Sequence, residues 1–366
     1  MHELELFSAV KANAGLDFIT PLRKVLDSHW YVMGNEVRSF ENEFAGYLGV
    51  EHCISVANGT DALELALRGL NVQAGARVVT VANAGFYASS AIYAIGARPV
   101  YIDVDSATLT LCPKALAAVL DSSLAAIIVT HLYGQLADIE EIVRLASAAG
   151  IPVLEDCAQA HGARRNGKRA GSFGAVACFS FYPTKNLGAL GDGGAVVTNK
   201  HDMAARIRQL RQYGWGQKYQ VTLAGGRNSR MDEIQAAVLR IKLPYLDSWN
   251  EQRRFIAKRY NAAFNTFDMR LPYSTAADYV AHLYVIRLAN RPPFINALKL
   301  KGIKTDIHYP IPDHRQPAYP AEHPYPLTVT EHACETVVSL PCHPGMTGDD
   351  ADRVITSVTA YFEQEG

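Results

Sequence analysis

The chain has 366 residues, of which 49% are hydrophobic and 19% are charged, and its formal net charge is −1. This composition is typical of a globular protein with room for two domains, and it excludes a disordered chain. A net charge close to zero, without a long basic run, also excludes a surface built to attract nucleic acid or an anionic membrane.

The start of the chain and its cysteines indicate the compartment. Residues 1–5 are acidic and lack the charged and apolar regions of a secretory signal. No window holds the ~18 uninterrupted apolar residues that a membrane span needs. The six cysteines are scattered and form no CxxC pair, which is typical of buried thiols and not of a disulfide framework or a zinc site. We therefore expect a cytoplasmic protein without a metal.

Helical and strand-like segments alternate through the first half of the chain. Two helices are predicted first, at residues 18–28 and 35–48. Apolar strands are predicted at residues 53–57, 77–81, 98–104, 125–130, 151–155 and 175–181. Helices are predicted between the first five of these strands, at residues 62–70, 86–95, 113–120 and 138–149. This alternation predicts an α/β fold with a mainly parallel sheet between two layers of helices.

The last third of the chain has a different pattern. Helices at residues 201–212, 231–243 and 245–264 lead into a strand at 282–288 and a helix at 292–301. A segment rich in proline and histidine follows at 308–326, and a final helix is predicted at 348–364. We interpret this region as a small α+β domain. The predicted division is a large domain at 1–245 and a small C-terminal domain at 246–366.

Polar residues follow several of the predicted strands, at the edge where ligands bind to a parallel sheet. These groups lie at residues 58–61, 83–87, 131–135, 156–161 and 180–185. Gly59 and Thr60 precede a helix, so their backbone N–H groups predict an anion site, although an ordinary helix cap explains them equally well. Five such groups at one edge of a sheet predict a binding crevice there.

Lys185 is the only charged residue between Ala170 and Gly191. An amine in such an apolar stretch is partly desolvated, which lowers its pKa and makes it a usable nucleophile. Asp156 ends an apolar strand, and a buried carboxylate there needs a cationic partner. A surface lysine and a helix-capping aspartate are the simpler interpretations of these two residues.

Pyridoxal phosphate would need four groups from the protein: a lysine, a carboxylate for its ring nitrogen, an aromatic face and a phosphate cradle. Lys185, Asp156, Phe86 and the Gly59-Thr60 turn supply one of each at different strand ends. Ser180 could add a hydroxyl to the cradle. Phe86 as a core residue and Ser180 as a strand-end hydroxyl remain the alternatives.

Several motifs in this order resemble the DegT/DnrJ/EryC1/StrS family of sugar aminotransferases. The chain carries NGTDAL at 58–63, EDCAQAHG at 155–162, SFYPTKNLG at 180–188, GDGG at 191–194, NSR at 228–230 and HYP at 308–310. The resemblance covers nearly the whole chain. It implies a type I aminotransferase fold with a mainly parallel seven-stranded sheet, a small α+β domain and pyridoxal 5′-phosphate as cofactor.

The resemblance also implies roles for individual residues. Lys185 would bind the cofactor covalently and carry the proton, Asp156 would hold the ring nitrogen protonated, and Gln159 would lie near the 3-hydroxyl. Phe86 would stack on the ring, while Gly59, Thr60, Ser180 and, from the neighbouring subunit, Asn228 would bind the phosphate. A homodimer with shared active sites follows. The chain departs from many members before Phe86, where Gly85 stands in place of a threonine.

The implied reaction transfers an amino group from L-glutamate, which leaves as 2-oxoglutarate, to a nucleotide-linked keto sugar. The candidates for contacts with the sugar nucleotide are the cations Arg230, His308 and Lys218, the stacking side chains Tyr219 and Trp30, and Tyr309 of the HYP motif. The stretch at 81–85 is most similar to members that aminate C3 of dTDP-3-keto-6-deoxyhexoses, whose products enter surface polysaccharides such as lipopolysaccharide O-antigen. Amination at C4 of a UDP- or dTDP-4-keto sugar is the alternative.

Two other functions are weighed against transamination. A related branch removes the 3-hydroxyl of a sugar with the same cofactor, but it carries a histidine at the position of Lys185. A non-catalytic, cofactor-binding regulator would have no need of the complete set of Lys185, Asp156 and Gln159. The sequence therefore favours a catalytic aminotransferase.

Overall fold

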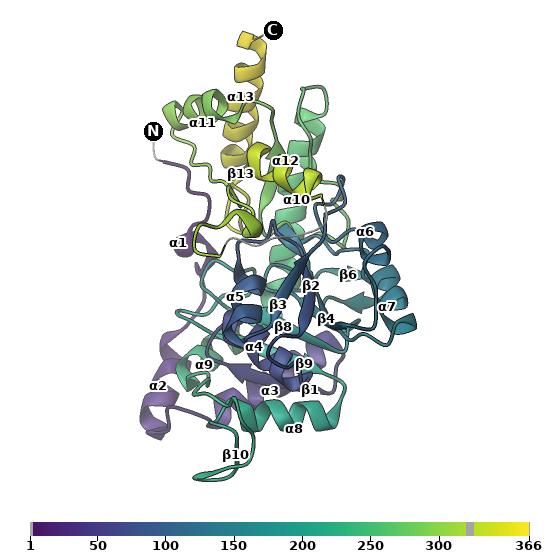
Figure 1. Cartoon of the computed structure of the whole chain (residues 1–366). Helices are drawn as coiled ribbons and strands as arrows, with labels where there is room; N and C mark the ends of the chain where they lie inside the picture. The colour runs from purple at the N-terminus through teal and green to yellow at the C-terminus, as the bar shows by residue number, and fades with distance from the viewer. Residues whose placement is uncertain (1–2, 320–325, 366) are drawn as a thin grey trace.

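A seven-stranded sheet forms the centre of the molecule in the computed structural model, which describes residues 3–319 and 326–365 (Figure 1). The strands are β1 (His52–Val56), β2 (Arg77–Thr80), β3 (Arg98–Tyr101), β4 (Leu124–Thr130), β5 (Val153–Asp156), β8 (Val176–Ser180) and β9 (Gly194–Thr198). Their order is β1-β9-β8-β5-β4-β2-β3, and β9 alone runs antiparallel to its neighbours. The predicted α/β class and mainly parallel sheet are confirmed.

Helices cover both faces of this sheet (Figure 1). The large domain contains α2 (Ile19–Ser28), α3 (Asn35–Leu48), α4 (Gly59–Gly69), α5 (Tyr87–Ala94), α6 (Pro113–Ala117), α7 (Ile139–Ala148), α8 (His201–Leu210) and α9 (Glu233–Lys242). Successive side chains of β8 point to opposite layers: Phe179 packs with Phe44 of α3, whereas Cys178 packs in the cluster that contains Leu65 of α4. This alternation buries both faces and leaves only the strand ends open to a ligand.

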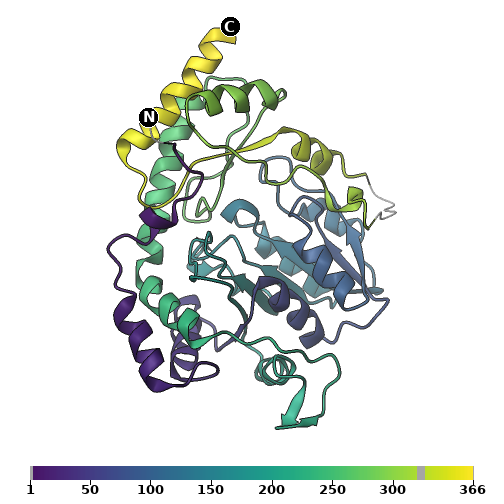
Figure 2. The ribbon, with the colours of Figure 1, turned by 90° about the vertical axis from the view of Figure 1, so that its left-hand side faces the viewer.

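The small domain packs above the carboxyl ends of the strands (Figure 2). It contains α10 (Leu246–Phe264), β12 (Tyr284–Arg287), α11 (Arg291–Leu300), η3 (Asp313–Arg315), α12 (Thr328–Thr336), β13 (Val337–Leu340) and α13 (Gly348–Glu365). Tyr260, Tyr284 and Val354 share its core with Leu4 from the start of the chain, which pairs with Ile303. The predicted boundary at 245/246 falls at the start of α10. The N-terminal segment that contains Leu4 also packs into the small domain.

Several short elements complete the described chain. They are α1 (Ala9–Ala12), η1 (Leu132–Gly134), η2 (Leu243–Tyr245), the pair β6 (Arg164–Arg165) and β7 (Lys168–Arg169), and the pair β10 (Trp215–Gln217) and β11 (Gln220–Val221). The β10–β11 hairpin projects from the body of the molecule on the side away from the small domain (Figures 1 and 2). Among the described residues, no helix combines the length and apolar character that a membrane crossing requires.

Some predicted elements differ from the structure. The sequence pattern alone did not identify β9, α12 or β13, and the strand expected at 282–288 is limited to Tyr284–Arg287. The proline- and histidine-rich segment expected at 308–326 includes residues 320–325, which lie outside the described residues.

Candidate active site

A cavity of about 720 Å³ lies where the strand ends meet the small domain. Most of the predicted site residues line it, although they come from segments far apart in the sequence. They are Gly59, Thr60, Asp156, Gln159, Ser180, Lys185, His308 and Tyr309. The cavity also receives Leu6 and Phe7 from the N-terminal segment and Arg253 from α10. The crevice predicted from the strand ends is therefore present.

Lys185 lies in the turn that follows β8. Its backbone N–H donates to the Tyr182 carbonyl at 2.8 Å, and its side chain lines the cavity. Burial lowers the pKa of its amine to about 8, although the negative charge of Asp156 acts in the opposite direction. An amine with this pKa is uncharged in a substantial fraction of molecules near neutral pH, as a nucleophile or proton carrier requires.

Asp156 is the last residue of β5 and is buried. Its carboxylate accepts hydrogen bonds from the Ala158 N–H at 3.1 Å and from the Thr130 hydroxyl at 3.3 Å. Burial nevertheless raises its pKa, and these hydrogen bonds and the charge of Lys185 offset only part of that rise. The carboxylate therefore holds its negative charge best when a cation lies in front of it.

The turn before α4 and the end of β8 form a polar cradle. The Asn58 side chain accepts from the Asp61 N–H at 2.8 Å, so the helix cap considered above does exist. The N–H groups of the first helical turn have no intrahelical acceptor, and Gly59 and Thr60 line the cavity there. A Cβ on Gly59 would lie 2.6 Å from the Ser180 Cβ, so only glycine lets the Ser180 hydroxyl approach this helix end. This geometry suits a phosphate group.

Gln159 and Tyr309 form one wall of the cavity. The side-chain oxygen of Gln159 (Oε1) accepts from the Tyr133 N–H at 2.6 Å, and its side-chain Nε2 donates to the Tyr309 hydroxyl at 3.1 Å. Gly85 has a φ of +80°, and any Cβ there would lie 2.9 Å from the Tyr309 ring. This close contact explains physically why the residue before Phe86 is glycine and not threonine.

The structure places Phe86 differently from the prediction. Phe86 does not line the cavity, because its ring packs against Tyr93 and Tyr319, at centroid distances of 6.2 and 5.1 Å. Its neighbour Tyr87 lines the cavity instead, with its ring 6.0 Å from that of Tyr309. The sequence has two adjacent aromatic residues at 86 and 87, and Tyr87 is the one that lines the cavity.

Three further predicted residues lie outside the cavity of their own chain. Tyr219 is on the projecting hairpin and is 78% exposed, with the Lys218 amine 5.0 Å from its ring centre. Asn228 is exposed and pairs with Gln212, and the Arg230 guanidinium lies 6.0 Å from the Tyr213 ring centre. None of the three lines the cavity within one chain.

Residues 14–359 match the model of the DegT/DnrJ/EryC1/StrS aminotransferase family. The chain belongs to this family. A transaminase from Aneurinibacillus thermoaerophilus, named for dTDP-3-amino-3,6-dideoxy-α-D-galactopyranose, is 45% identical over 93% of this chain and 94% of that protein. A transaminase from Streptomyces venezuelae, named for dTDP-3-amino-3,4,6-trideoxy-α-D-glucose, is 42% identical over 94% of this chain and 91% of that protein.

The solved structures show the same fold. The crystal structure of DesV from S. venezuelae in complex with a ketimine intermediate has a TM-score of 0.95 and 40% identity, over 99% of both chains. The type I aminotransferase fold expected from the sequence is therefore confirmed. The protein is a pyridoxal-phosphate-dependent aminotransferase of this family.

The residues of the cavity fit this cofactor. The cradle between Gly59 and Ser180 leaves no room for a side chain at position 59. Asp156 needs a cation such as a protonated ring nitrogen. Lys185 has the lowered pKa of a reactive amine. When bound, pyridoxal phosphate supplies an electron sink for the carbon that carries the transferred amine. The residues present could hold each part of this group, and Lys185 is an amine whose lowered pKa suits proton transfer.

Two histidines also lie near Lys185: His161 belongs to the polar group predicted at 156–161, whereas His282 gave no clear signal in the sequence. His282 lines the cavity, and His161 lies behind it against Phe179 and Phe181. Burial and the charge of Lys185 lower the pKa of His161 to about 3 and that of His282 well below its ordinary value. Both imidazoles are therefore neutral near pH 7. The position of His282 depends on tertiary packing that no local pattern encodes.

Proposed function

We propose that the enzyme transfers the amino group of L-glutamate to C3 of a dTDP-linked 3-keto-6-deoxyhexose. The observation that carries this proposal is the shared position of the amine in the names of two close relatives. Both names place it at C3 of a dTDP sugar, and they differ at C4 and in the parent hexose. The C3 position therefore has more support than any stereochemistry elsewhere in the sugar.

In this proposal the residues of the cavity take the following roles. Lys185 binds the cofactor and moves the proton, Asp156 keeps the ring nitrogen protonated, and Gln159 lies near the 3-hydroxyl. Gly59, Thr60, Ser180 and the partner subunit's Asn228 hold the phosphate. Tyr87, which lines the cavity where Phe86 does not, provides the aromatic face of the ring. Its place beside Tyr309 supports this reassignment.

An acidic amino donor fits the charges of the cavity. Arg253 lines the cavity and is almost completely buried, and it donates to the carbonyls of Ala281, His282 and Cys342 through one nitrogen. It forms no ion pair with a described carboxylate. A buried guanidinium without a counter-ion favours an anionic ligand, and a donor carboxylate would supply that charge.

In this proposal the sugar nucleotide enters the cavity and contacts His308 and Tyr309, which line it. Arg230 and Tyr219 lie outside the cavity of their own chain, so in this proposal they act on the site of the partner subunit. We further propose a cytoplasmic homodimer whose product is used for surface polysaccharide such as lipopolysaccharide O-antigen. The family resemblance supports the homodimer, the action of Arg230 and Tyr219 on the partner's site, and the use of the product for surface polysaccharide.

The test is a panel of keto-sugar nucleotides with L-glutamate as donor, in which 2-oxoglutarate is measured. We expect the highest kcat/KM with a dTDP-3-keto-6-deoxyhexose, and a product whose nuclear magnetic resonance spectrum places the amine at C3. A preference for a 4-keto sugar, or an amine at C4, would overturn the proposed position. A preference for UDP over dTDP would overturn the proposed nucleotide.

A further inference from the structure

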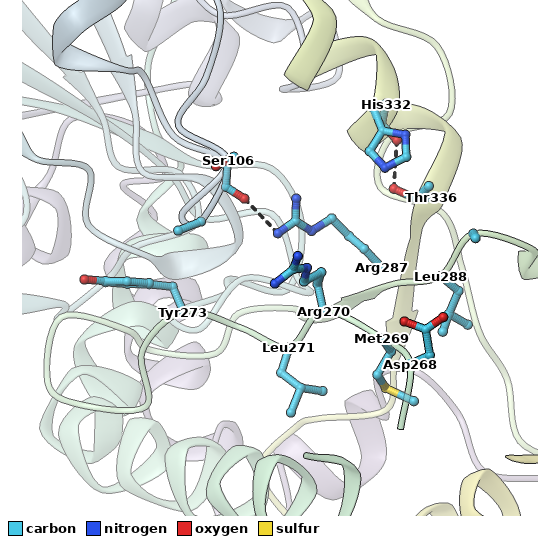
Figure 3. A pocket seen from close by; sticks show the side chains of 12 residues that line it. Ser106, Asp268, Met269, Arg270, Leu271, Tyr273, Arg287, Leu288, His332 and Thr336 are labelled. Atoms are coloured by element: carbon cyan, nitrogen blue, oxygen red, sulfur yellow. Dashed lines mark hydrogen bonds between the residues drawn. The ribbon is translucent and has the colours of Figure 1, made fainter. Parts of the chain in front are cut away.

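A second cavity, of about 510 Å³, lies on the small domain and shares no lining residue with the active site (Figure 3). One side of it is the loop after β3, with Ser106 and Ala107. The rest comes from the segment after α10, from β12 and from α12. Its other lining residues are Asp268, Met269, Arg270, Leu271, Tyr273, Arg287, Leu288, Ala289, His332 and Thr336.

Two arginines face each other in this cavity. Arg270 and Arg287 form an isolated antiparallel bridge, in which each N–H donates to the other's carbonyl, at 3.0 and 2.9 Å. Residues paired in this way have side chains on the same face, and like charges directly opposite each other are destabilising. Figure 3 shows both guanidinium groups reaching into the same part of the cavity. Burial and then the positive charge of Arg270 lower the pKa of Arg287, and the negative charge of Asp105 offsets only part of this shift.

Neither arginine forms an ion pair with a carboxylate in the described parts of the chain, although the negative charge of Asp105 acts on Arg287 from nearby. Arg287 donates to the Ser106 carbonyl at 2.8 Å, which fixes its guanidinium but adds no negative charge. Asp268 lines the same cavity without an ion pair to either arginine, and in Figure 3 its carboxylate lies beside Met269. The chain as a whole has a formal net charge of −1, so this positive cluster does not reflect a generally basic surface.

We propose that this cavity binds the phosphate group of a small molecule between Arg270 and Arg287. A phosphate carries up to two negative charges and accepts paired hydrogen bonds from planar guanidinium groups, so it would remove the repulsion between them. Leu271, Leu288 and the exposed Tyr273 also line the cavity, and their side chains flank the two arginines (Figure 3), so an organic group attached to the phosphate has apolar surface to pack against. This binding site is independent of the proposed sugar substrate.

The experiment is thermal unfolding of the enzyme with its cofactor bound, with and without inorganic phosphate. Saturating phosphate should raise the Tm of the wild type by about 1–3 °C, because a ligand that binds only the folded state stabilises it. R270Q should lose this rise, and without phosphate its Tm should equal or exceed that of the wild type because the repulsion is removed. R98Q, which removes an exposed arginine on β3, should behave like the wild type.

The source of the phosphate is tested by comparing inorganic phosphate with thymidine 5′-monophosphate. Only the part of each shift that R270Q abolishes is assigned to this cavity, which separates it from binding at the active site. A larger shift with the nucleotide, reduced in Y273A, identifies a nucleotide ligand, and equal shifts identify free phosphate. If R270Q does not fold, isothermal titration of R287K, which keeps the charge, should show at least about tenfold weaker binding. The same phosphate response in wild type, R270Q and R287K would overturn the proposal.

Discussion

At the level of single residues, two lysines have similarly lowered pKa values but lie in different places. Burial lowers the pKa of both Lys185 and Lys242 to about 8. Lys242 ends α9, donates to the Gly188 carbonyl at 2.7 Å and does not line the active-site cavity. Lys185 lines the cavity and interacts with the charge of Asp156. The lowered pKa alone would not distinguish them, so the cavity decides which amine meets the cofactor.

This difference gives a direct prediction. Borohydride reduction of the enzyme with its cofactor, followed by peptide mapping, should place the adduct on Lys185 and leave Lys242 unmodified. K185A should lose transamination by at least about 100-fold, because it removes the group that moves the proton. K242A is the matched control and should retain activity in molecules that fold. An adduct on Lys242 or on any other lysine contradicts the assignment.

Most residues of the cavity could be predicted because short patterns in the sequence mark them. Lys185, Asp156 and the Gly59-Thr60 turn each end or follow an apolar strand, and a parallel sheet brings such ends together. Tyr87 was missed because Phe86 is adjacent and equally aromatic. The orientation of Phe86 depends on its left-handed backbone, with a φ of 70°, and on the hydrogen bond from its N–H to Asp313, which is far away in the sequence.

At the level of elements, the small domain holds the start of α5 in place. Asp313 of η3 accepts from the Phe86 N–H at 2.9 Å and from the Ser89 hydroxyl at 2.5 Å, and its own N–H donates to the Ala82 carbonyl at 2.7 Å. These contacts join the loop after β2 to a segment more than two hundred residues away. Tyr87 is the first residue of α5, directly after Phe86, so Asp313 positions this wall of the cavity from a distant part of the chain.

Asp313 should also make stability depend on pH. Burial raises its pKa from 3.8 to about 7, although the hydrogen bonds from Ser89 and Phe86 oppose this shift. The folded state therefore holds the proton more tightly than the unfolded state, and folding takes up a proton between these two values. This contribution to the free energy of unfolding is fully present below about pH 4 and falls as the pH rises to about 7.

The prediction is that D313N, which cannot ionise but keeps the shape of the side chain, loses this pH dependence. Its Tm should fall less than that of the wild type between about pH 5 and pH 8. D313A should be less stable by about 1–3 kcal/mol, because the Phe86 N–H loses its acceptor. D349N, which alters an exposed carboxylate on α13, is the control for general charge effects. If the Tm of D313N and that of the wild type depend on pH in the same way, Asp313 is ionised over this whole range and its pKa is not raised by burial.

Two of the strands that sequence patterns missed, β9 and β13, have a common physical cause. Residues Gly194–Thr198 form β9, which lies between β1 and β8. Its partner β1 lies more than a hundred residues upstream in the sequence. The expected helix-strand alternation has no place for an antiparallel strand directly after a glycine-rich loop. β13 likewise follows α12 without a connecting turn and is defined by its pairing with β12. Long-range pairing decides these strands, and local composition does not record it.

At the scale of the whole molecule, one chain leaves part of the predicted site unused. The β10–β11 hairpin projects from the body and exposes apolar side chains, with Tyr219 78% and Val221 61% exposed (Figure 2). Such exposure is typical of a surface that contacts a partner. Arg227 meanwhile pairs with Asp61 at 3.1 Å and with Glu64, which ties the base of this loop to α4 of its own chain. The loop could therefore serve its own site or that of a second subunit.

The last prediction separates these two arrangements. K185A and N228A chains, each inactive alone, are mixed under subunit exchange, and activity is measured while mass spectrometry confirms mixed dimers. If Asn228 completes the site of the partner subunit, a mixed dimer contains one intact site, because both mutations fall in the other one. At full exchange about half of the dimers are mixed, so activity should approach a quarter of the wild-type value per chain.

The matched control for this experiment is a mixture of K185A and D156N chains. Lys185 and Asp156 line the same cavity of one chain, so every site in a mixed dimer keeps one defect and no activity should return in either arrangement. Recovery with N228A but not with D156N therefore requires a site built from two chains. Failure of N228A to recover activity, with exchange confirmed and N228A itself inactive, would place Asn228 with the cavity of its own chain and make the shared site untenable.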